Sequence, residues 1–239
     1  MISPILLDEV DSTNAWVLAQ AATLADGQWV LARRQTAGRG RRGRNWAGDP
    51  RNLAATCLLR LAPEDSRPHL FSFVAALALH QACAQFVPAQ RLWLKWPNDL
   101  LLDGAKLSGI LLEREGEVLA AGFGVNLAVA PPVPGRQTIA LADAIDAAPP
   151  HPESFLIQLD AALCHWRRSW RAEGFALIRS AWLARAHAIG TWLETSGAAG
   201  PARGRFEGLG DDGELVLRDA AGRLLLLHAG DVTHAAQPA

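Results

Sequence analysis

The segment with the clearest chemical character is a short loop rich in glycine and arginine, Gly38-Arg39-Gly40-Arg41-Arg42-Gly43-Arg44. Its four arginines fall within six residues and repel one another, so an ordinary surface loop has little reason to collect them. Glycines let a backbone approach a ligand closely, and guanidinium groups match the oxygens of phosphates and carboxylates. The loop therefore favours a ligand that carries a phosphate, a carboxylate or both, as an acyl-adenylate does.

The same loop formally contains the G-x-G-x-x-G pattern of dinucleotide-binding proteins. That pattern must open a helix, whereas this chain continues through residues 45–52, with Gly48 and Pro50 as breakers, into an expected strand. The flanking residues thus argue against a dinucleotide site. A nucleic-acid-binding arginine run and a solvated surface loop stay open, although the formal net charge of −1 argues against bulk nucleic-acid binding.

A second polar segment, the Lys-Trp-Pro-Asn-Asp run of residues 95–99, interrupts a series of short apolar stretches. Pro97 is expected to stop the strand before it and to leave Asn98 and Asp99 displayed at the strand end. Further along, Lys106 is a single cation directly before an otherwise apolar strand. These residues could bind a ligand. Alternatively, Asn98 and Asp99 could form an ordinary turn, and Lys106 could extend its ammonium group into solvent.

In a third segment, Gly122 and Gly124 lie within an expected strand that ends near Asn126. Glycine weakens the interior of a strand, so two glycines there indicate that a ligand or another stretch of backbone comes close. A β-bulge is the ordinary alternative at such positions.

Hydrophobic periodicity and turn residues predict the elements that must position these segments. A helix is expected to begin near Ser12, because residues 11–14 are good N-terminal caps. Apolar residues at helical spacing predict an amphipathic helix from Pro68 to about Phe86, and further helices over 152–173 and 175–186. Strands are expected at 29–33, 53–59, 92–95, 100–102, 106–113 and 118–125, the last four as consecutive hairpins.

The character of the sequence changes after about residue 188. Short strand candidates follow one another, separated by glycine-bearing turns, and they predict a small all-β module that resembles an SH3-like barrel. The architecture expected from the whole pattern is a mixed α+β domain followed by this small barrel. The strand candidates of the second part are residues 191–195, 203–209, 214–218 and 223–228.

The bulk composition is typical of a protein from a reducing compartment. With 239 residues, half of them hydrophobic, the chain can bury a sizeable core. Cys57, Cys83 and Cys164 lie far apart in apolar surroundings, so we expect buried thiols and neither a disulfide framework nor a zinc site. The sequence shows no signal peptide and no apolar run of about 18 residues. We therefore expect a cytoplasmic protein that binds neither membranes nor nucleic acids.

Five segments together resemble one family. Asp-Ser-Thr-Asn at 11–14, the loop within 35–46, Lys-Trp-Pro-Asn-Asp at 95–99, Lys-Leu-Ser-Gly-Ile at 106–110 and Gly-Phe-Gly-Val-Asn at 122–126 occur in the order and approximate spacing of biotin–protein ligases. One such motif would be weak evidence, but five in order are specific. The resemblance covers the first half of the chain at motif level and extends loosely to its end.

The resemblance implies a fold. It is an α+β chain with a mixed-sheet catalytic domain of the class II synthetase and biotin ligase type at residues 1–187, followed by an SH3-like β-barrel at 188–239. Regulatory members of the family carry an N-terminal DNA-binding domain, but only eleven residues precede Ser12 here. We therefore expect a short form without direct repressor activity. Such ligases can also pair through their sheet edges, so a homodimer is possible.

The resemblance also implies an ordered two-step reaction. Biotin's carboxylate attacks the α-phosphate of ATP and gives biotinyl-5′-adenylate and pyrophosphate. A lysine of a biotin carboxyl carrier protein, an acetyl-CoA carboxylase subunit, then attacks the acyl carbon and releases AMP. Mg²⁺ would accompany ATP through the phosphates and water, with no metal site caged by protein ligands. A lipoate or octanoate ligase or transferase, a nucleic-acid-binding module and a non-catalytic biotin sensor are the alternatives.

The family's site residues carry over residue by residue onto matching positions. The resemblance assigns no ligand contact to Arg42 or Arg44. Asp99 would orient the acceptor lysine or take its proton, and Trp46 would help to close the loop over the adenylate. The resemblance implies catalytic roles for Arg39, Arg41, Lys106 and Asp99, biotin contacts from Ser12, Thr13, Asn14, Gln35, Arg39, Gly40, Arg41, Lys106 and Gly109, and nucleotide contacts from Arg41, Trp46, Asn98 and Asn126.

Overall fold

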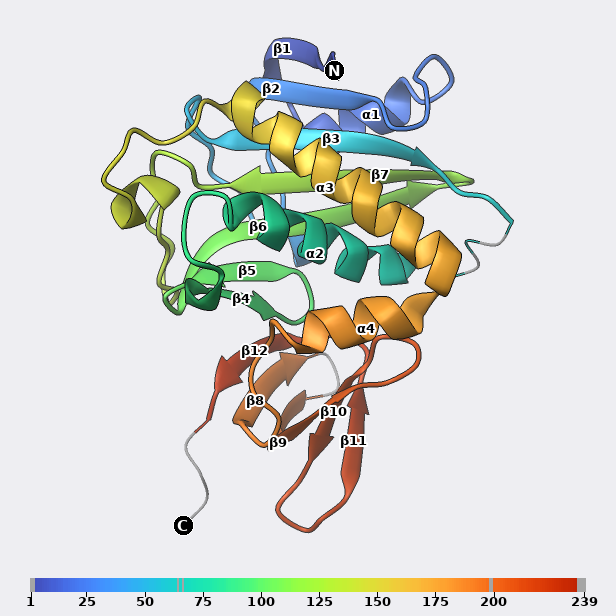
Figure 1. Ribbon diagram of the computed structural model, residues 1–239, viewed down its shortest axis with the longest axis vertical. Coiled ribbons are helices and arrows are strands. Elements are labelled where there is room, and N and C mark those ends of the chain that lie inside the picture. The colour runs from blue at the N-terminus through green and yellow to red at the C-terminus, as the bar shows by residue number, and fades with distance from the viewer. Residues whose placement is uncertain (1–2, 64, 66, 198–199, 236–239) are drawn as a thin grey trace.

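A seven-stranded mixed sheet lies at the centre of the larger part of the protein (Figure 1). The computed structural model describes residues 3–63, 65, 67–197 and 200–235. The strand order is β1-β2-β3-β7-β6-β5-β4; β1 and β2 are parallel, and every other neighbouring pair is antiparallel. The strands are β1 (Ile5–Val10), β2 (Trp29–Gln35), β3 (Leu53–Arg60), β4 (Leu92–Lys95), β5 (Asp99–Leu102), β6 (Ala105–Glu115) and β7 (Val118–Val125).

Tight turns connect β5, β6 and β7 as the consecutive hairpins that the sequence predicts. Asp103 and Gly104 join β5 to β6 with φ angles of +49° and +84°, the left-handed conformation that a two-residue hairpin turn requires at both positions. Gly116, at φ +58°, supplies the same conformation between β6 and β7. These turns bring together the segments in which the polar residues of the sequence motifs lie.

Helices cover both faces of the central sheet (Figure 1). α2 (Phe71–Cys83) and α3 (Pro152–Glu173) pack on one face, and the short α1 (Thr13–Ala19) packs on the other. In β3, Cys57 belongs to the larger core under α2 and α3, whereas the next residue, Leu58, belongs to the cluster under α1. Because both faces are covered, successive side chains of this strand must be apolar.

The prediction that α2 is amphipathic is wrong. Eleven of its thirteen residues are buried, and the exceptions are Ser72 and Gln81. The sheet covers one side of the helix, and α3 and α4 (Phe175–Leu183) pack against the others, so no wide polar face is left. The helix also starts later than expected, because Pro68–Leu70 form a 3₁₀ turn before it.

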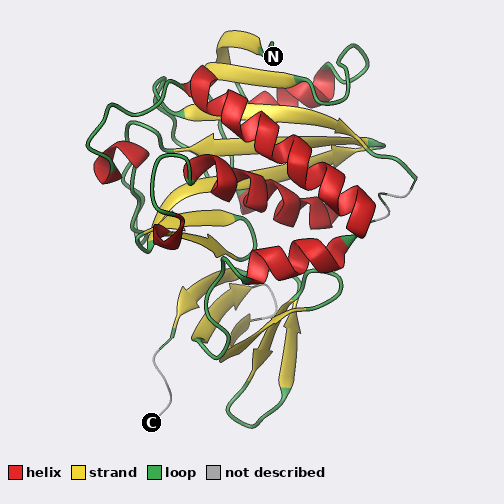
Figure 2. Cartoon of the chain, viewed as in Figure 1, coloured by secondary structure: helices red, strands yellow, loops and turns green. Residues whose placement is uncertain are grey.

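The smaller part is a five-stranded antiparallel sheet with the order β11-β10-β9-β8-β12 (Figure 2). Within the described residues, β11 and β12 are not paired with each other, so the structure shows an open sheet and the predicted barrel closure is not found. β1 and β12 were not predicted from the sequence, because β1 contains Asp8 and Glu9 and β12 has a single apolar residue, Val232. The strands are β8 (Trp192–Gly197), β9 (Gly200–Leu209), β10 (Leu215–Arg218), β11 (Leu224–Leu227) and β12 (Asp231–His234).

The two sheets share one hydrophobic core. Phe73 of α2 meets Trp182 of α4 edge to face at a centroid distance of 5.6 Å, and Phe206 and Leu217 of the second sheet belong to the same buried cluster. The indole of Trp96, which follows β4, donates a hydrogen bond of 3.0 Å to a carbonyl in the β9–β10 connection. Burial of this apolar surface couples the second sheet to the first.

The three cysteines do not share one environment. Cys57 and Cys83 are buried, as the sequence predicts, and burial raises the pKa of each thiol. Cys164 is exposed, so that part of the prediction is wrong. Its position on α3, which covers the sheet from outside, explains the difference. No helix among the described residues is long and apolar enough to cross a membrane.

Gly213, in the β9–β10 connection, provides a test of the shared core. Its φ is +78°, and a Cβ there would lie 2.6 Å from the ring of Phe73. Gly213→Ala should therefore cost both backbone strain and a clash, about 2–4 kcal/mol of unfolding free energy in urea titrations. The control is Gly222→Ala, where φ is +82° but no atom lies within 4 Å of the added Cβ, so a loss of about 1 kcal/mol is expected. Equal losses in the two variants would contradict the clash.

Candidate functional site

A cavity of about 550 Å³ lies beside the start of α1, between the glycine/arginine loop and the segment of residues 131–138. Strands β6 and β7 form its floor. The structure thus brings together segments that are far apart in the chain. Every predicted site residue except Asp99 lines this cavity: Ser12, Thr13, Asn14, Gln35, Arg39, Gly40, Arg41, Trp46, Asn98, Lys106, Gly109 and Asn126.

One end of the cavity is lined by uncharged hydrogen-bonding groups, which a network of contacts holds in place. The backbone NH and the hydroxyl of Thr13 both donate to Gln35 Oε1, at 2.8 Å and 3.1 Å. The hydroxyl of Thr56 lies 2.8 Å from Thr13 Oγ1 and 2.7 Å from Asn14 Oδ1. The amide of Asn14 in turn donates to Glu113 Oε2 at 2.9 Å. These mutual contacts hold the polar groups in fixed directions.

Thr56 and Glu113 were not predicted as parts of the site. Each is a polar residue within a largely apolar strand, β3 or β6, and that is the sequence signal that could have identified them. Ser12 also has a role besides lining the cavity, because its hydroxyl accepts a hydrogen bond from the backbone NH of Ala15 and caps α1. The predicted start of the helix at Ser12 is confirmed.

Side chains of the protein itself fill the space above the two glycines of β7. A Cβ at Gly122 would collide with the amide of Asn14, and a Cβ at Gly124 would collide with the indole of Trp46. The register of β7 against β3 and β6 is regular at both glycines, so the alternative of a bulge is wrong. Both glycines are therefore required for close approach, but the approaching groups are side chains that line the cavity and not the ligand or backbone that the sequence analysis expected.

The opposite end of the cavity is cationic. Lys106 Nζ lies 2.6 Å from Asp99 Oδ1 and 5.6 Å from the centre of the Trp46 ring, and only 13% of the lysine side chain is exposed. Burial lowers the pKa of Lys106, and the nearby carboxylate of Asp99 only partly opposes that shift. One ordinary alternative is wrong, because Lys106 does not extend into solvent. The other holds in part, because Asn98 lies in the turn between β4 and β5, whereas Asp99 opens β5.

An irregularity in strand pairing places Lys106 on the cavity side of the sheet. Asp99 pairs with Gly109 and Leu101 pairs with Lys106, with a register shift between Leu100 and Leu101. Residues directly opposite each other point to the same face, so the shift puts Lys106 on the face of Asp99 and Gly109. In an unbroken register Lys106 would face the other way. The extra residue works as a β-bulge that redirects one side chain.

Asn98 and Arg41 form the wall next to this ion pair. The amide of Asn98 donates to the carbonyl of Ile110 at 2.6 Å and so secures the end of β4 to β6. Arg41 donates to Asn98 Oδ1 at 3.5 Å, and its burial lowers the pKa of the guanidinium. Arg39 is exposed, and its side chain borders the cavity.

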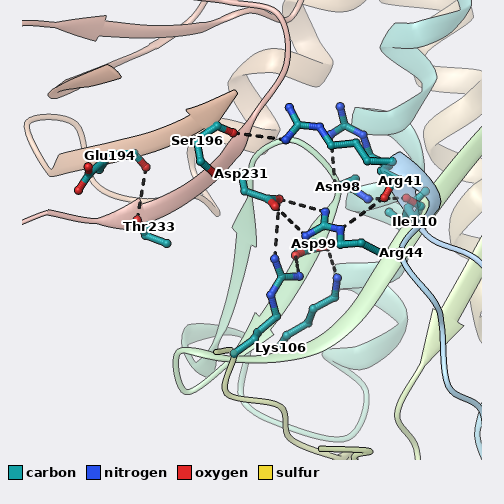
Figure 3. Close-up of polar contacts among 12 residues, drawn as sticks. Arg41, Arg44, Asn98, Asp99, Lys106, Ile110, Glu194, Ser196, Asp231 and Thr233 are labelled. Atoms are coloured by element: carbon teal, nitrogen blue, oxygen red, sulfur yellow. Dashed lines mark hydrogen bonds and ion pairs between the residues drawn. The ribbon is translucent and has the colours of Figure 1, made fainter. Parts of the chain in front are cut away.

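The proline-rich segment after β7 forms the remaining wall. Asn126 anchors it by donating to the carbonyl of Ile139 at 3.3 Å. The segment also contributes Arg136, which the sequence analysis did not single out. Arg136 Nη1 lies 3.3 Å from Asp99 Oδ2, so the carboxylate of Asp99 binds two cations, Lys106 and Arg136. The contact between Asp99 and Lys106 is drawn in Figure 3. An arginine in an irregular loop carries no sequence signal that points to this contact.

The cavity therefore offers two kinds of chemistry to one ligand. Fixed hydrogen-bonding groups at the start of α1 suit an uncharged polar head, and the cations at the other end suit a carboxylate, a phosphate or both. Within the described residues, no cluster of three or more His, Cys, Asp or Glu side chains could hold a metal ion.

Relatives of the chain share its length and its fold. A biotin–[acetyl-CoA-carboxylase] ligase from Paracoccus denitrificans is 43% identical over 92% of this chain and 96% of its own length. One from Mycobacterium tuberculosis is 34% identical over 95% of this chain and 86% of its own length. The biotin protein ligase from Aquifex aeolicus in complex with biotin and ATP has the same fold, with a TM-score of 0.85, 23% identity and coverage of 98% of this chain and 100% of that one.

The sequence profile of the biotin/lipoate A/B protein ligase family matches residues 6–129, which include α1, the glycine/arginine loop and the cavity floor. The match and the full-length relatives agree with the segments that the sequence analysis identified. The chain belongs to the biotin/lipoate A/B protein ligase family.

Proposed function

We propose that this protein is an ATP-dependent ligase that forms biotinyl-5′-adenylate and transfers biotin to a lysine of a biotin carboxyl carrier protein. The observation that carries the proposal is the single cavity with an uncharged hydrogen-bonding end and a cationic end. The names of the full-length relatives support biotin over lipoate, and the Aquifex aeolicus structure contains biotin and ATP.

The uncharged end is suited to the ureido ring of biotin. Thr13, Asn14 and Gln35 supply donors and acceptors there, and Ser12 completes the surface. Gly109 would contact biotin nearer its carboxylate, because a Cβ at this position would lie 3.1 Å from Lys106 Nζ. These groups already contact one another, but a plain fatty-acyl chain would cover their remaining donors and acceptors without pairing them, which costs about 1–3 kcal/mol per group. This cost favours biotin over octanoate.

The cationic end is suited to adenylation. Biotin's carboxylate oxygen attacks the α-phosphorus, the bond to the bridging oxygen breaks, and pyrophosphate leaves. Mg²⁺ would accompany ATP through phosphates and water and would neutralise part of their charge. Arg39, Arg41 and Lys106 would stabilise the charge that develops, with Gly40 allowing close backbone approach. Trp46, Asn98 and Asn126 would contact the nucleotide from the adjoining walls.

In the second step the acceptor amine attacks the acyl carbon, and AMP leaves. Asp99 holds Lys106 and Arg136 through its two carboxylate oxygens, and it would also take the amine proton. We therefore assign Asp99 first to positioning these cations. The second part of the proposal is that Asp99 takes the proton of the acceptor lysine's amine.

We also propose two domains, residues 1–187 and 188–239, the second of SH3-like type; residues 1–2, 64, 66, 198–199 and 236–239 lie outside the described residues. The division is supported by strand pairing, because no strand of one sheet pairs with a strand of the other within the described residues. We propose cytoplasmic location and no binding of nucleic acid. A homodimer would use β1, an edge strand of the larger sheet, because at the other edge Leu94 of β4 already pairs with Ala186.

The experiment that tests the function is incubation with biotin, MgATP and an apo carrier domain, followed by mass spectrometry of the carrier. A gain of one biotinyl group on a single lysine is expected. Parallel reactions with lipoate and octanoate decide between members of the family. If either acid modifies its carrier and biotin does not, the proposal is wrong.

Replacement of a cavity arginine should damage adenylation selectively. Arg39→Ala and Arg41→Ala should each lower biotin-dependent ATP–pyrophosphate exchange by about 10²–10³-fold, the usual effect of losing one preorganised charge. The matched control is Arg33→Ala on β2, an exposed arginine paired with Asp8 outside the cavity, which should leave the rate nearly unchanged. Rates within a few-fold of wild type for both cavity variants would overturn their assignment.

The pH profile should report the titration of Lys106. Its pKa is lowered by burial, so the ammonium loses its proton, and adenylation falls, at lower pH than for an exposed lysine. Asp99→Asn removes the charge that opposes this shift and should move the alkaline limb of kcat/KM to still lower pH. Pyrophosphate exchange measured between about pH 6 and pH 10 follows the limb. In Lys106→Arg the alkaline limb should disappear, because arginine does not lose its proton in this pH range. An alkaline limb that stays unchanged in this variant would contradict the role of Lys106.

A further inference from the structure

The arginines of the glycine/arginine loop point to two different partners. Arg39 and Arg41 border the cavity, as described above. Arg42 and Arg44, for which the family resemblance implied no ligand contact, reach the second sheet. Figure 3 shows Arg44 beside Asp231. Arg42 donates to the carbonyl of Ser196 at 3.4 Å, and Arg44 donates two hydrogen bonds to Asp231, at 2.6 Å and 3.2 Å.

Both contacts come from one place in the second sheet. Asp231 opens β12, and its partner across the strand pair is Ser196 of β8. This one pair of residues therefore contacts two neighbouring arginines of the loop. The two parallel bonds between the Arg44 guanidinium and the Asp231 carboxylate restrict direction as well as distance.

Asp231 also contacts the loop on the other side of the cavity. Arg136 Nη2 lies 3.7 Å from Asp231 Oδ1, and Arg136 Nη1 lies 3.3 Å from Asp99. Arg44 and Arg136 both line the cavity. A single carboxylate of the second sheet is thus shared by the glycine/arginine loop and the proline-rich segment.

The environment keeps this carboxylate charged and in place. Only 26% of the Asp231 side chain is exposed, and Arg136 is exposed to 23%. Burial alone would raise the pKa of Asp231, but the hydrogen bond from Arg44 and the charges of Arg44, Arg136 and Lys95 outweigh burial and lower it.

Holding Arg44 also holds the backbone that carries Arg41. The NH of Gly40 donates to the carbonyl of Arg44 at 2.7 Å, and the NH of Arg44 approaches the carbonyl of Arg41 at 3.4 Å. The turn that presents Arg41 to the cavity is therefore closed at the residue that Asp231 fixes.

We propose that Asp231 is a positioning residue for adenylation, which joins the two loops flanking the cavity and fixes Arg41, Arg44 and Arg136 where the phosphates of ATP bind. The second sheet then contributes directly to the geometry of the ATP site. This inference rests on the proposed function for its kinetic consequence, although the joining of the loops can be tested without any substrate.

The kinetic test compares Asp231→Asn with wild type in biotin-dependent pyrophosphate exchange. KM for ATP is expected to rise about 5–10-fold, since a partly exposed pair contributes about 1 kcal/mol, with a much smaller change in KM for biotin. Asp231→Glu, which keeps the charge, should recover most of the loss. The matched control is Asp211→Asn: Asp211 also joins the second sheet to an arginine of the first, Arg179 of α4 at 2.6 Å, but lies outside the cavity lining. It should leave both KM values unchanged.

Hydrogen exchange of the substrate-free protein separates the two proposals. In Asp231→Asn, the amides of Gly40, Trp46 and Arg136 should exchange faster, while those of α3 keep their rates. Unchanged loop exchange together with wild-type KM for ATP would overturn the role of Asp231 and leave the ligase function intact. If the wild-type protein shows no biotin-dependent ATP–pyrophosphate exchange, the proposed ligase function is wrong. The hydrogen-exchange rates of the loop amides still decide whether Asp231 joins the two loops. A uniform acceleration, including α3, would mean general destabilisation and would also overturn the proposal.

Discussion

The ion pair between Lys106 and Asp99 is the interaction on which the cationic half of the cavity depends. Two opposite charges are buried together at 2.6 Å, and either one left alone would carry a desolvation penalty of several kcal/mol. The pair exists because a register shift turns Lys106 to the cavity side of β6. Arg136 joins the same carboxylate from another segment. The position of each cation is therefore set by a strand irregularity and a shared anion, and not by a flexible side chain alone.

The two ends of the cavity obey different physical rules. At the start of α1 the groups are neutral, and they satisfy one another through short hydrogen bonds among Thr13, Asn14, Gln35 and Thr56. At the other end like charges stand close together, and Asp99 and Asp231 keep them there. Directional hydrogen bonds fix the groups at the neutral end, and the opposite charges of the carboxylates hold the cations at the other end. A ligand with a neutral head and an anionic tail meets both conditions at once.

The sequence was sufficient to predict much of the fold, and every predicted site residue except Asp99 lines the cavity. Gly/Pro punctuation located the hairpins, and motif spacing identified Thr13, Arg41 and Lys106. It was not sufficient where the determining contact is remote in the chain. Arg136 and Asp231 meet their partners only through tertiary structure. Likewise, the sheet, α3 and α4 pack around α2 and leave it without the polar face that periodicity predicted. The bulge that turns Lys106 leaves no trace in composition.

The paired glycines of β7 have a consequence for altering ligand preference by design. The space above Gly122 and Gly124 is already filled by Asn14 and Trp46, so any larger residue there would displace a wall of the cavity before it touched a ligand. A larger side chain at either glycine therefore cannot be used to reshape the cavity floor. A designer who wishes to accommodate a longer or bulkier acyl group must work from the surrounding segments, of which residues 131–135 offer several side chains at the rim.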